Sequence, residues 1–171
     1  MSTPELNLPK HESIRGYFAY ELHQQMAKDS SIWLITGDLG YKMWDFVRRD
    51  FPERFINTGA AETAMMGIGV GLALEGKKPF VYSITTFLLY RPFETIRNYI
   101  DHESVPVRLV GSGWHHDYQH DGFSHHPEEQ RQVLGLWPNI TSLFPAGKEA
   151  IPDMVKQMVE INKPWYINLR R

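Results

Sequence analysis

The sequence contains no cysteine, so disulfide bonds and thiolate chemistry are excluded. It also lacks an excess of basic residues: the formal net charge is -2, and Lys and Arg gather no further than pairs such as Lys77-Lys78 and Arg170-Arg171. The longest apolar run, Met65–Leu74, is interrupted by glycines and is shorter than the roughly 20 residues that span a bilayer. We therefore expect no nucleic-acid partner, no membrane partner and a cytoplasmic location.

The amino-terminal residues 1–9 are polar and contain proline, without the basic and then apolar pattern of a signal peptide. With 171 residues, of which 42% are hydrophobic, the chain can bury one sizeable core but is short for two ordinary domains. We therefore interpret residues 1–171 as a single domain.

Segments of helical period alternate with short β-rich runs, several of which are apolar throughout, as parallel strands covered on both faces are. This pattern predicts an α/β fold with a doubly wound, mostly parallel six-stranded sheet, helices on both faces, and ligands beyond the carboxyl ends of the strands. The expected strands are Ile32–Thr36, Arg54–Asn57, Phe80–Thr85, Val107–Gly111, Ile140–Phe144 and Trp165–Leu169, and the expected helices are Ile14–Ala27, Ala60–Glu75, Phe87–Asp101 and Glu149–Ile161, with Gly76 as a helix stop.

A single acidic residue, Glu62, precedes an almost wholly apolar helix in which Gly67 and Gly71 share one face. Composition by itself favours an ordinary first-turn glutamate, whose interaction with the helix dipole contributes about 0.3–1 kcal/mol. Glycines at this spacing let another backbone approach closely, which predicts that the helix packs against a second chain or a similar element.

Aromatic residues recur every third position just after a predicted strand, at Phe87, Tyr90 and Phe93. On one continuous helix they would share a face, and taken alone this spacing is typical of an ordinary core stripe. Pro92 fits the first turn of a following helix, where a missing N–H costs nothing.

A polar loop over residues 114–126 holds five of the eight histidines, together with two aspartates. Zinc sites use such ligands, but no spacing here matches a helical or paired-ligand motif, and a polar loop can hold histidines without an ion. We therefore expect no metal site in this chain.

Taken in order, these segments resemble the pyrimidine-binding domain of transketolase-type thiamine-diphosphate enzymes over nearly the whole chain. Asp121–His125 is similar to the family's Asp-Gly-Pro-Thr-His element, although Phe123 stands where the family usually has proline and His126 where glutamine is common, which leaves the substrate open. The other matching segments are Thr36–Gly40, Arg54–Glu62, Gly69–Phe80 and Thr86–Leu88.

The resemblance implies that thiamine diphosphate is the cofactor and that Glu62 hydrogen-bonds its pyrimidine ring. A buried carboxylic acid can stay protonated and share its proton with the ring, which stabilises the imino tautomer that deprotonates the thiazolium carbon. It also implies that Tyr90 stacks on the ring between Phe87 and Phe93, each aromatic pair contributing about 0.5–1.5 kcal/mol.

The same resemblance places Asp121 and His125 at the mouth of the active site, in contact with the hydroxyls or carbonyl oxygen of a sugar-like substrate. A neutral histidine there can donate to a developing oxyanion or pass a proton. Asp38 and His116 are further candidates for this cleft.

Members of this family hold the diphosphate through Mg²⁺ at a Gly-Asp-Gly motif, which this sequence lacks. The sequence also ends soon after its last predicted strand, so we expect no third domain in this chain. The resemblance thus implies a split enzyme, in which a separate diphosphate-binding subunit carries Gly-Asp-Gly and binds Mg²⁺. The expected particle is an α2β2 tetramer with two sites arranged about a dyad.

The favoured function is two-carbon (ketol) transfer from a ketose phosphate to an aldehyde by a transketolase-type transferase. A pyrimidine-domain subunit of a two-subunit 2-oxo-acid decarboxylase or dehydrogenase would share Glu62 but use a 2-oxo acid as donor. A non-catalytic regulatory module is the third interpretation, and retention of Glu62, the aromatic residues and His125 argues against it.

Overall fold

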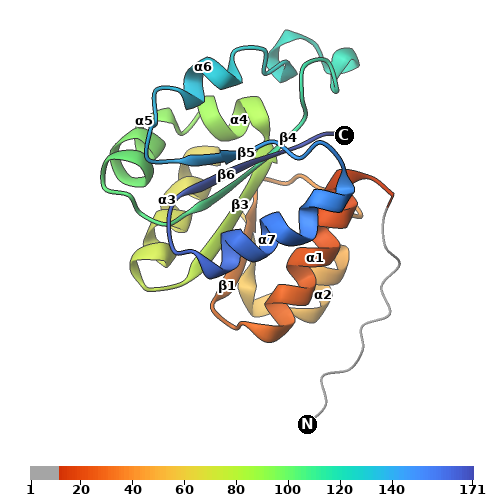
Figure 1. Ribbon diagram of the computed structural model, residues 1–171, viewed down its shortest axis with the longest axis vertical. Coiled ribbons are helices and arrows are strands. Elements are labelled where there is room, and N and C mark those ends of the chain that lie inside the picture. The colour runs from red at the N-terminus through yellow and green to blue at the C-terminus, as the bar shows by residue number, and fades with distance from the viewer. Residues whose placement is uncertain (1–11) are drawn as a thin grey trace.

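The computed structural model describes residues 12–171, so residues 1–9, in which no signal-peptide pattern is found, lie outside the described part. An all-parallel six-stranded sheet with strand order β2-β1-β3-β4-β6-β5 crosses the molecule (Figure 1), which confirms the predicted α/β class. The strands are β1 (Ile32–Thr36), β2 (Phe55–Asn57), β3 (Lys78–Ile84), β4 (Arg108–Ser112), β5 (Thr141–Leu143) and β6 (Trp165–Leu169).

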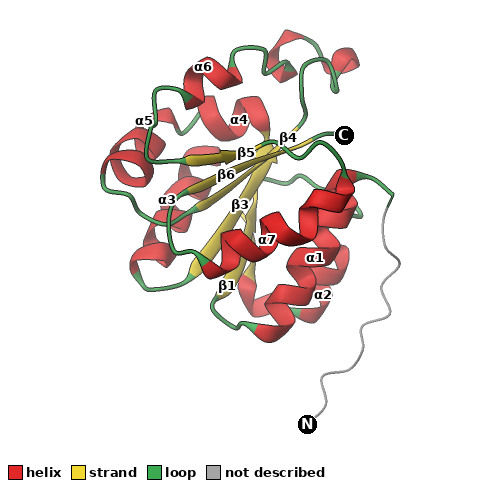
Figure 2. Cartoon of the chain, viewed as in Figure 1, coloured by secondary structure: helices red, strands yellow, loops and turns green. Residues whose placement is uncertain are grey.

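Helices lie between the strands along the chain (Figure 2). None of those described in residues 12–171 is long and apolar enough to cross a membrane. The α-helices are α1 (Ile14–Lys28), α2 (Asp45–Asp50), α3 (Glu62–Leu74), α4 (Thr85–Tyr90), α5 (Phe93–Thr95), α6 (Gln130–Leu134) and α7 (Ile151–Glu160); η2 (Ile96–His102) is a π-helix, and η1 (Pro52–Arg54), η3 (Gln119–Asp121), η4 (Phe123–His125) and η5 (Lys148–Ala150) are 3-10 turns.

Two hydrophobic layers cover the two faces of the sheet, as the apolar strands predicted. One face packs against α1, α2 and α7, and the other against α3, α4, η2 and α6 (Figure 1). Neighbouring residues of a strand point to opposite layers: Leu34 belongs to the first and Ile35 to the second, as do Phe80 and Val81. The helices therefore hold the sheet from both sides and leave its strand ends free to carry a site.

The predicted helix over Phe87–Asp101 is wrong as a single element. The chain forms α4, turns at Arg91-Pro92, and continues as α5 and η2. Proline has no N–H to donate within a helix, and its ring crowds the preceding turn, so the helix breaks there. The other predicted boundaries agree with the structure within two residues, and Gly76 follows α3 with φ at +75°.

The strand order reverses direction beside β1, because the chain crosses from β1 to β2 on one side and then to β3 on the other. In open parallel sheets such a switch point opens a crevice at the carboxyl ends of the strands, where ligands bind. Here three segments meet at the carboxyl-terminal ends of the strands, which we call the carboxyl edge of the sheet: the loop 37–44 after β1, the start of α3 after β2 and the start of α4 after β3.

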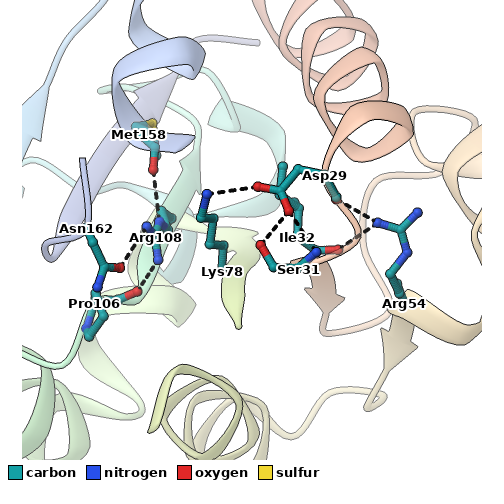
Figure 3. A network of polar contacts seen from close by, with 9 residues as sticks. All are labelled: Asp29, Ser31, Ile32, Arg54, Lys78, Pro106, Arg108, Met158 and Asn162. Atoms are coloured by element: carbon teal, nitrogen blue, oxygen red, sulfur yellow. Dashed lines mark hydrogen bonds and ion pairs between the residues drawn. The ribbon is translucent and has the colours of Figure 1, made fainter. Parts of the chain in front are cut away.

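Hydrogen bonds and an ion pair hold together the opposite edge of the sheet, which the amino-terminal ends of the strands form (Figure 3). Asp29 accepts hydrogen bonds from Lys78 Nζ at 2.8 Å and from Ser31 Oγ at 2.6 Å, and Arg54 donates to the backbone carbonyl of Asp29 at 3.0 Å. These bonds join α1, β1, β2 and β3 at the amino-terminal ends of the strands. They give this edge a structural role.

A buried arginine, Arg108, begins β4 at the same edge. Its guanidinium donates to the carbonyls of Met158 and Pro106 and to the side chain of Asn162 (Figure 3). Burial lowers the pKa of Arg108 to about 10, which still leaves it charged at neutral pH. The hydrogen bond from Arg108 to the carbonyl of Met158 therefore links the end of α7 to the start of β4.

Asp29 gives the fold a predictable acid sensitivity. Burial raises the pKa of Asp29, but its bonds to Lys78 and Ser31 outweigh that effect and hold the pKa at about 2. A folded-state pKa below the unfolded value contributes stability that is lost as the pH falls from about 4 to about 2. Because the side chain is 28% exposed, we expect Asp29→Asn to cost about 1–2 kcal/mol at neutral pH and nearly nothing at pH 2.

Urea unfolding across a pH series measures this difference. The variant Lys78→Met is the matched partner, and in its background Asp29→Asn should cost clearly less. An Asp29→Asn penalty that stays constant down to pH 2 would show that the carboxylate charge is not its source.

Candidate functional site

Glu62 is the first residue of α3 and is only 3% exposed, which agrees with the buried carboxylic acid that the family resemblance implied. Its Oε2 accepts a hydrogen bond from Arg91 Nη1 at 2.8 Å. Arg91 comes from the turn after α4, and its side chain is 46% exposed. The carboxylate of Glu62 is therefore buried but compensated by a cation that reaches it from the surface.

An aromatic wall adjoins this carboxylate. The Arg91 guanidinium lies over the ring of Phe87 at 3.7 Å from the ring centroid. The Phe87 ring also meets His125 at 4.8 Å in an edge-to-face arrangement, and Thr86 Oγ1 donates to the carbonyl of Ser124 at 2.8 Å. The fold thus brings Glu62, Phe87 and His125 together, although they come from three separate segments.

The other two predicted aromatic residues have different surroundings. Phe93 packs against Trp137 at 5.0 Å, because the break at Pro92 turns it away from the Phe87 surface. Tyr90 packs against the core layer that includes α3 and α4. Burial raises the pKa of Tyr90, with the Glu129 carboxylate adding to the effect. Their contact with a cofactor stays a prediction.

A basic pocket lies beyond His125, and sequence reasoning missed it. The pocket has a volume of about 370 Å³ and lies between the start of α1, the loop after β1 and the carboxyl-terminal ends of β3 and of the chain. Among the described residues that line it, three are cationic and none is acidic: Arg15, Lys42 and Arg171. The pocket is therefore suited to an anionic group.

Tyr118 links the polar loop of residues 114–126, here called the histidine loop, to this pocket. Its ring lies 6.1 Å from that of His125, and its hydroxyl accepts a hydrogen bond from Arg15 at 3.1 Å and shares another with Ser112 Oγ at 2.7 Å. Arg171 lies over the same ring at 5.1 Å. Glu62, Arg91, Phe87, His125 and the pocket thus form one continuous row of contacts.

The remaining predicted substrate residues lie around this row without joining it. Asp38 follows β1 with φ at +60°, and its carboxylate accepts from Asn57 Nδ2 at 3.2 Å. Asp121 is exposed at the end of η3. His116 pairs with Glu128 at 3.3 Å. Their part in substrate binding stays a prediction.

One cluster at the end of the histidine loop could share a metal ion. Within residues 12–171, the donor atoms of His116, His126 and Glu128 lie within 4.8 Å of one another. Linear spacing did not indicate this group, because a turn of the loop brings His116 beside the later two residues. His116 and Glu128 are exposed, and their own contact at 3.3 Å accounts for the arrangement without an ion.

Comparison with known proteins identifies the family of this chain. Residues 11–171 match the family model for the transketolase pyrimidine-binding domain. A putative transketolase C-terminal section of Methanocaldococcus jannaschii is 31% identical over 162 residues, covering 94% of this chain and 51% of that protein. A 6-deoxy-6-sulfo-D-fructose transketolase subunit of a Clostridium species is 28% identical over 170 residues, covering 98% of this chain and 52% of that subunit.

A solved structure of a split-gene transketolase, an inactive β4 tetramer, has a TM-score of 0.81 to this chain at 30% identity, covering 93% of this chain and 51% of that one. The present chain therefore spans about half the length of the curated relatives it matches. Because the family model covers nearly all of its residues, the chain belongs to the transketolase pyrimidine-binding domain family.

Proposed function

We propose that this chain is the pyrimidine-binding subunit of a split, thiamine-diphosphate-dependent transferase of the transketolase type, acting on sugar-like donors that carry an anionic group. The observation that carries the proposal is the row of contacts from the buried Glu62 past Phe87 and His125 to the basic pocket. A reacting carbonyl near His125 and an anionic tail in the pocket would suit a donor of this kind.

The residues around Glu62 fit an aminopyrimidine ring. A planar N–H donor, the Arg91 guanidinium, already stacks on Phe87 and bonds to Glu62 Oε2, so the site accepts a flat group that presents an N–H. When bound, thiamine diphosphate supplies a nucleophilic carbon for the donor's carbonyl. Glu62 would hold a proton against the ring nitrogen, and Phe87, which lies beside the Glu62–Arg91 pair, would stack on the ring in the place that the resemblance gave to Tyr90.

His125 is the proposed hydrogen-bond donor to the substrate oxygen. Its Nδ1 bonds to Ser124 Oγ at 3.0 Å, which would orient the ring and direct Nε2 to the substrate. Such a donor stabilises charge that develops on a carbonyl oxygen. Asp121, Asp38 and His116 at the same edge would take hydroxyl groups.

The basic pocket favours a ketose phosphate over a 2-oxo acid. In a 2-oxo acid the carboxylate is attached directly to the reacting carbonyl, so it could not reach cations that lie beyond His125 and Tyr118. A sugar chain places its terminal phosphate or sulfonate several atoms from the carbonyl. The pocket would bind that group through Arg15, whose Nε has no hydrogen-bond partner among the described residues.

Steady-state kinetics of the assembled enzyme test this assignment. With a ketose phosphate as donor, we expect Arg15→Met to raise KM by about 10- to 100-fold and to change kcat much less, because one charge-assisted bond to the anion is lost. Arg15→Lys should recover part of the affinity.

Lys156→Met on α7, outside the pocket, is the matched control and should behave as the wild type. If the assembled enzyme turned over pyruvate but not the ketose phosphate, the alternative function, a 2-oxo-acid enzyme, would replace the proposed one. Absence of turnover with both donors, despite assembly, would favour a regulatory module.

A second subunit is part of the proposal, because the sequence has no Gly-Asp-Gly motif to hold Mg²⁺ and the diphosphate. One face of α3 is exposed and apolar, formed by Ala64, Gly67, Ile68, Gly71 and Leu74. A β-carbon added at Gly67 or Gly71 would meet no atom within 4 Å, so the face has room for a close neighbour. The diphosphate-binding subunit would pack there within an α2β2 particle.

A further inference from the structure

We propose that Arg91 acts as a placeholder: it occupies the aminopyrimidine subsite of the cofactor-free chain and must leave before Glu62 can act. This inference rests on the proposed function and adds a positioning residue that the resemblance did not supply. It starts from a single side chain, Arg91, whose guanidinium bonds to Glu62 and lies over the ring of Phe87.

The two contacts of Arg91 are those that a bound aminopyrimidine ring would need. The guanidinium is planar, lies 3.7 Å from the Phe87 ring centroid and donates an N–H to Glu62 Oε2 at 2.8 Å. A second flat group cannot stack on the same face of Phe87 at that distance. The bound cofactor and this position of Arg91 therefore exclude each other.

The partners of Arg91 are fixed, whereas Arg91 itself can move. Glu62 is buried at the start of α3, and Phe87 lies within α4. Arg91 follows the last residue of α4, immediately before the break at Pro92, and 46% of its side chain is exposed. Its long stem can carry the charge into water, and a bound ring that took the place of the guanidinium would keep Glu62 paired.

The placeholder has two consequences for the chain. A buried carboxylate without a partner is strongly unfavourable, so Arg91 stabilises the free subunit. Arg91 also occupies Glu62 Oε2, the carboxylate oxygen that a bound pyrimidine ring would have to reach. Departure of Arg91 therefore couples cofactor entry to activation of Glu62.

Titration of thiamine diphosphate by calorimetry tests the proposal, with the chain assembled with its partner in excess Mg²⁺. We expect Arg91→Met to bind the cofactor about 3- to 10-fold more tightly than the wild type, because the competing closed state is gone. Arg91→Lys keeps the charge but not the flat group and should lie between them. Arg97→Met, which removes the same charge six residues later where Arg97 bonds to Asn98, should match the wild type.

Affinity that is unchanged or weaker in Arg91→Met would overturn the placeholder role. If the assembled wild type did not bind the cofactor, that result would instead contradict the proposed function, and the placeholder role, which rests on it, would be wrong as well. The two failures are thus separated by the wild-type titration.

Thermal unfolding of the free chain supplies a readout that needs neither partner nor cofactor. We expect Arg91→Met to lower the Tm in the wild-type background and to have little effect in the Glu62→Gln background, since the neutral side chain needs no cation. If Arg91→Met lowered the Tm equally in both backgrounds, Arg91 and Glu62 would not be energetically coupled, and the placeholder role would be wrong.

Discussion

Glu62→Gln is expected to lower kcat of the assembled enzyme by about 10²- to 10⁴-fold, the range that a positioned proton-transfer group contributes. Glutamine has nearly the same volume and can still accept the hydrogen bond from Arg91, so the 3% exposed site should keep its packing. It cannot hold the proton that the proposed role requires. Hydrogen–deuterium exchange at the thiazolium carbon of the bound cofactor measures the affected step directly.

The matched control is Glu160→Gln, the same substitution at an exposed position at the end of α7, on the other face of the sheet. It should leave kcat and the exchange rate unchanged. Circular dichroism and cofactor titration of Glu62→Gln show whether folding and binding persist. If the Glu62→Gln enzyme binds the cofactor and its exchange rate at the thiazolium carbon equals that of the wild type, Glu62 does not have the proposed role.

Gly71→Trp is expected to weaken assembly with the diphosphate-binding subunit by about 100-fold or more, and to abolish turnover at working concentrations. Gly71 is exposed, and a β-carbon there would meet no atom outside its own stretch of helix within 4 Å, so a side chain can extend into solvent in the free chain. Replacing a helical glycine also stabilises the helix by up to about 1 kcal/mol. The effect should therefore appear in the complex and not in the free subunit. Analytical ultracentrifugation of the mixture and thermal unfolding of the free variant measure the two parts.

The variant Gly71→Ala separates the effect of side-chain size on assembly from the effect of replacing a helical glycine on stability. A single methyl group is small enough for a close helix contact to tolerate in part, so this variant should assemble better than Gly71→Trp while unfolding at a similar temperature. Normal assembly and activity of Gly71→Trp would show that the partner does not pack on this face of α3. Tight, Mg²⁺-dependent cofactor binding by the free wild-type chain would contradict the need for a partner altogether.

Local patterns predicted much of the fold because the physics behind them acts over short distances. Strands β1 and β6 were predicted with their observed ends, since runs of apolar residues covered on both faces have few other structures available. The start of α3 near Glu62 and the glycine stop at Gly76 follow from helix-end chemistry. The short helices α2 and α6 carried too few turns to give a periodic signal, and the sequence analysis missed them.

Residue order alone was enough to establish the parallel α/β architecture, an acidic residue at the opening of an apolar helix and the edge of the sheet where a site would form. It did not show which side chains meet at that edge. Pro92 breaks the predicted helix and sends Phe93 to Trp137, while Arg91 reaches back to Glu62, a contact across 29 residues.

Arg15 likewise meets Tyr118 across 103 residues, beside the basic pocket. Such pairs leave no trace in local periodicity, because their contact depends on how α1, β1, β3 and β6 are arranged in space. That arrangement follows from the strand order of the sheet, which is a property of the packed chain as a whole.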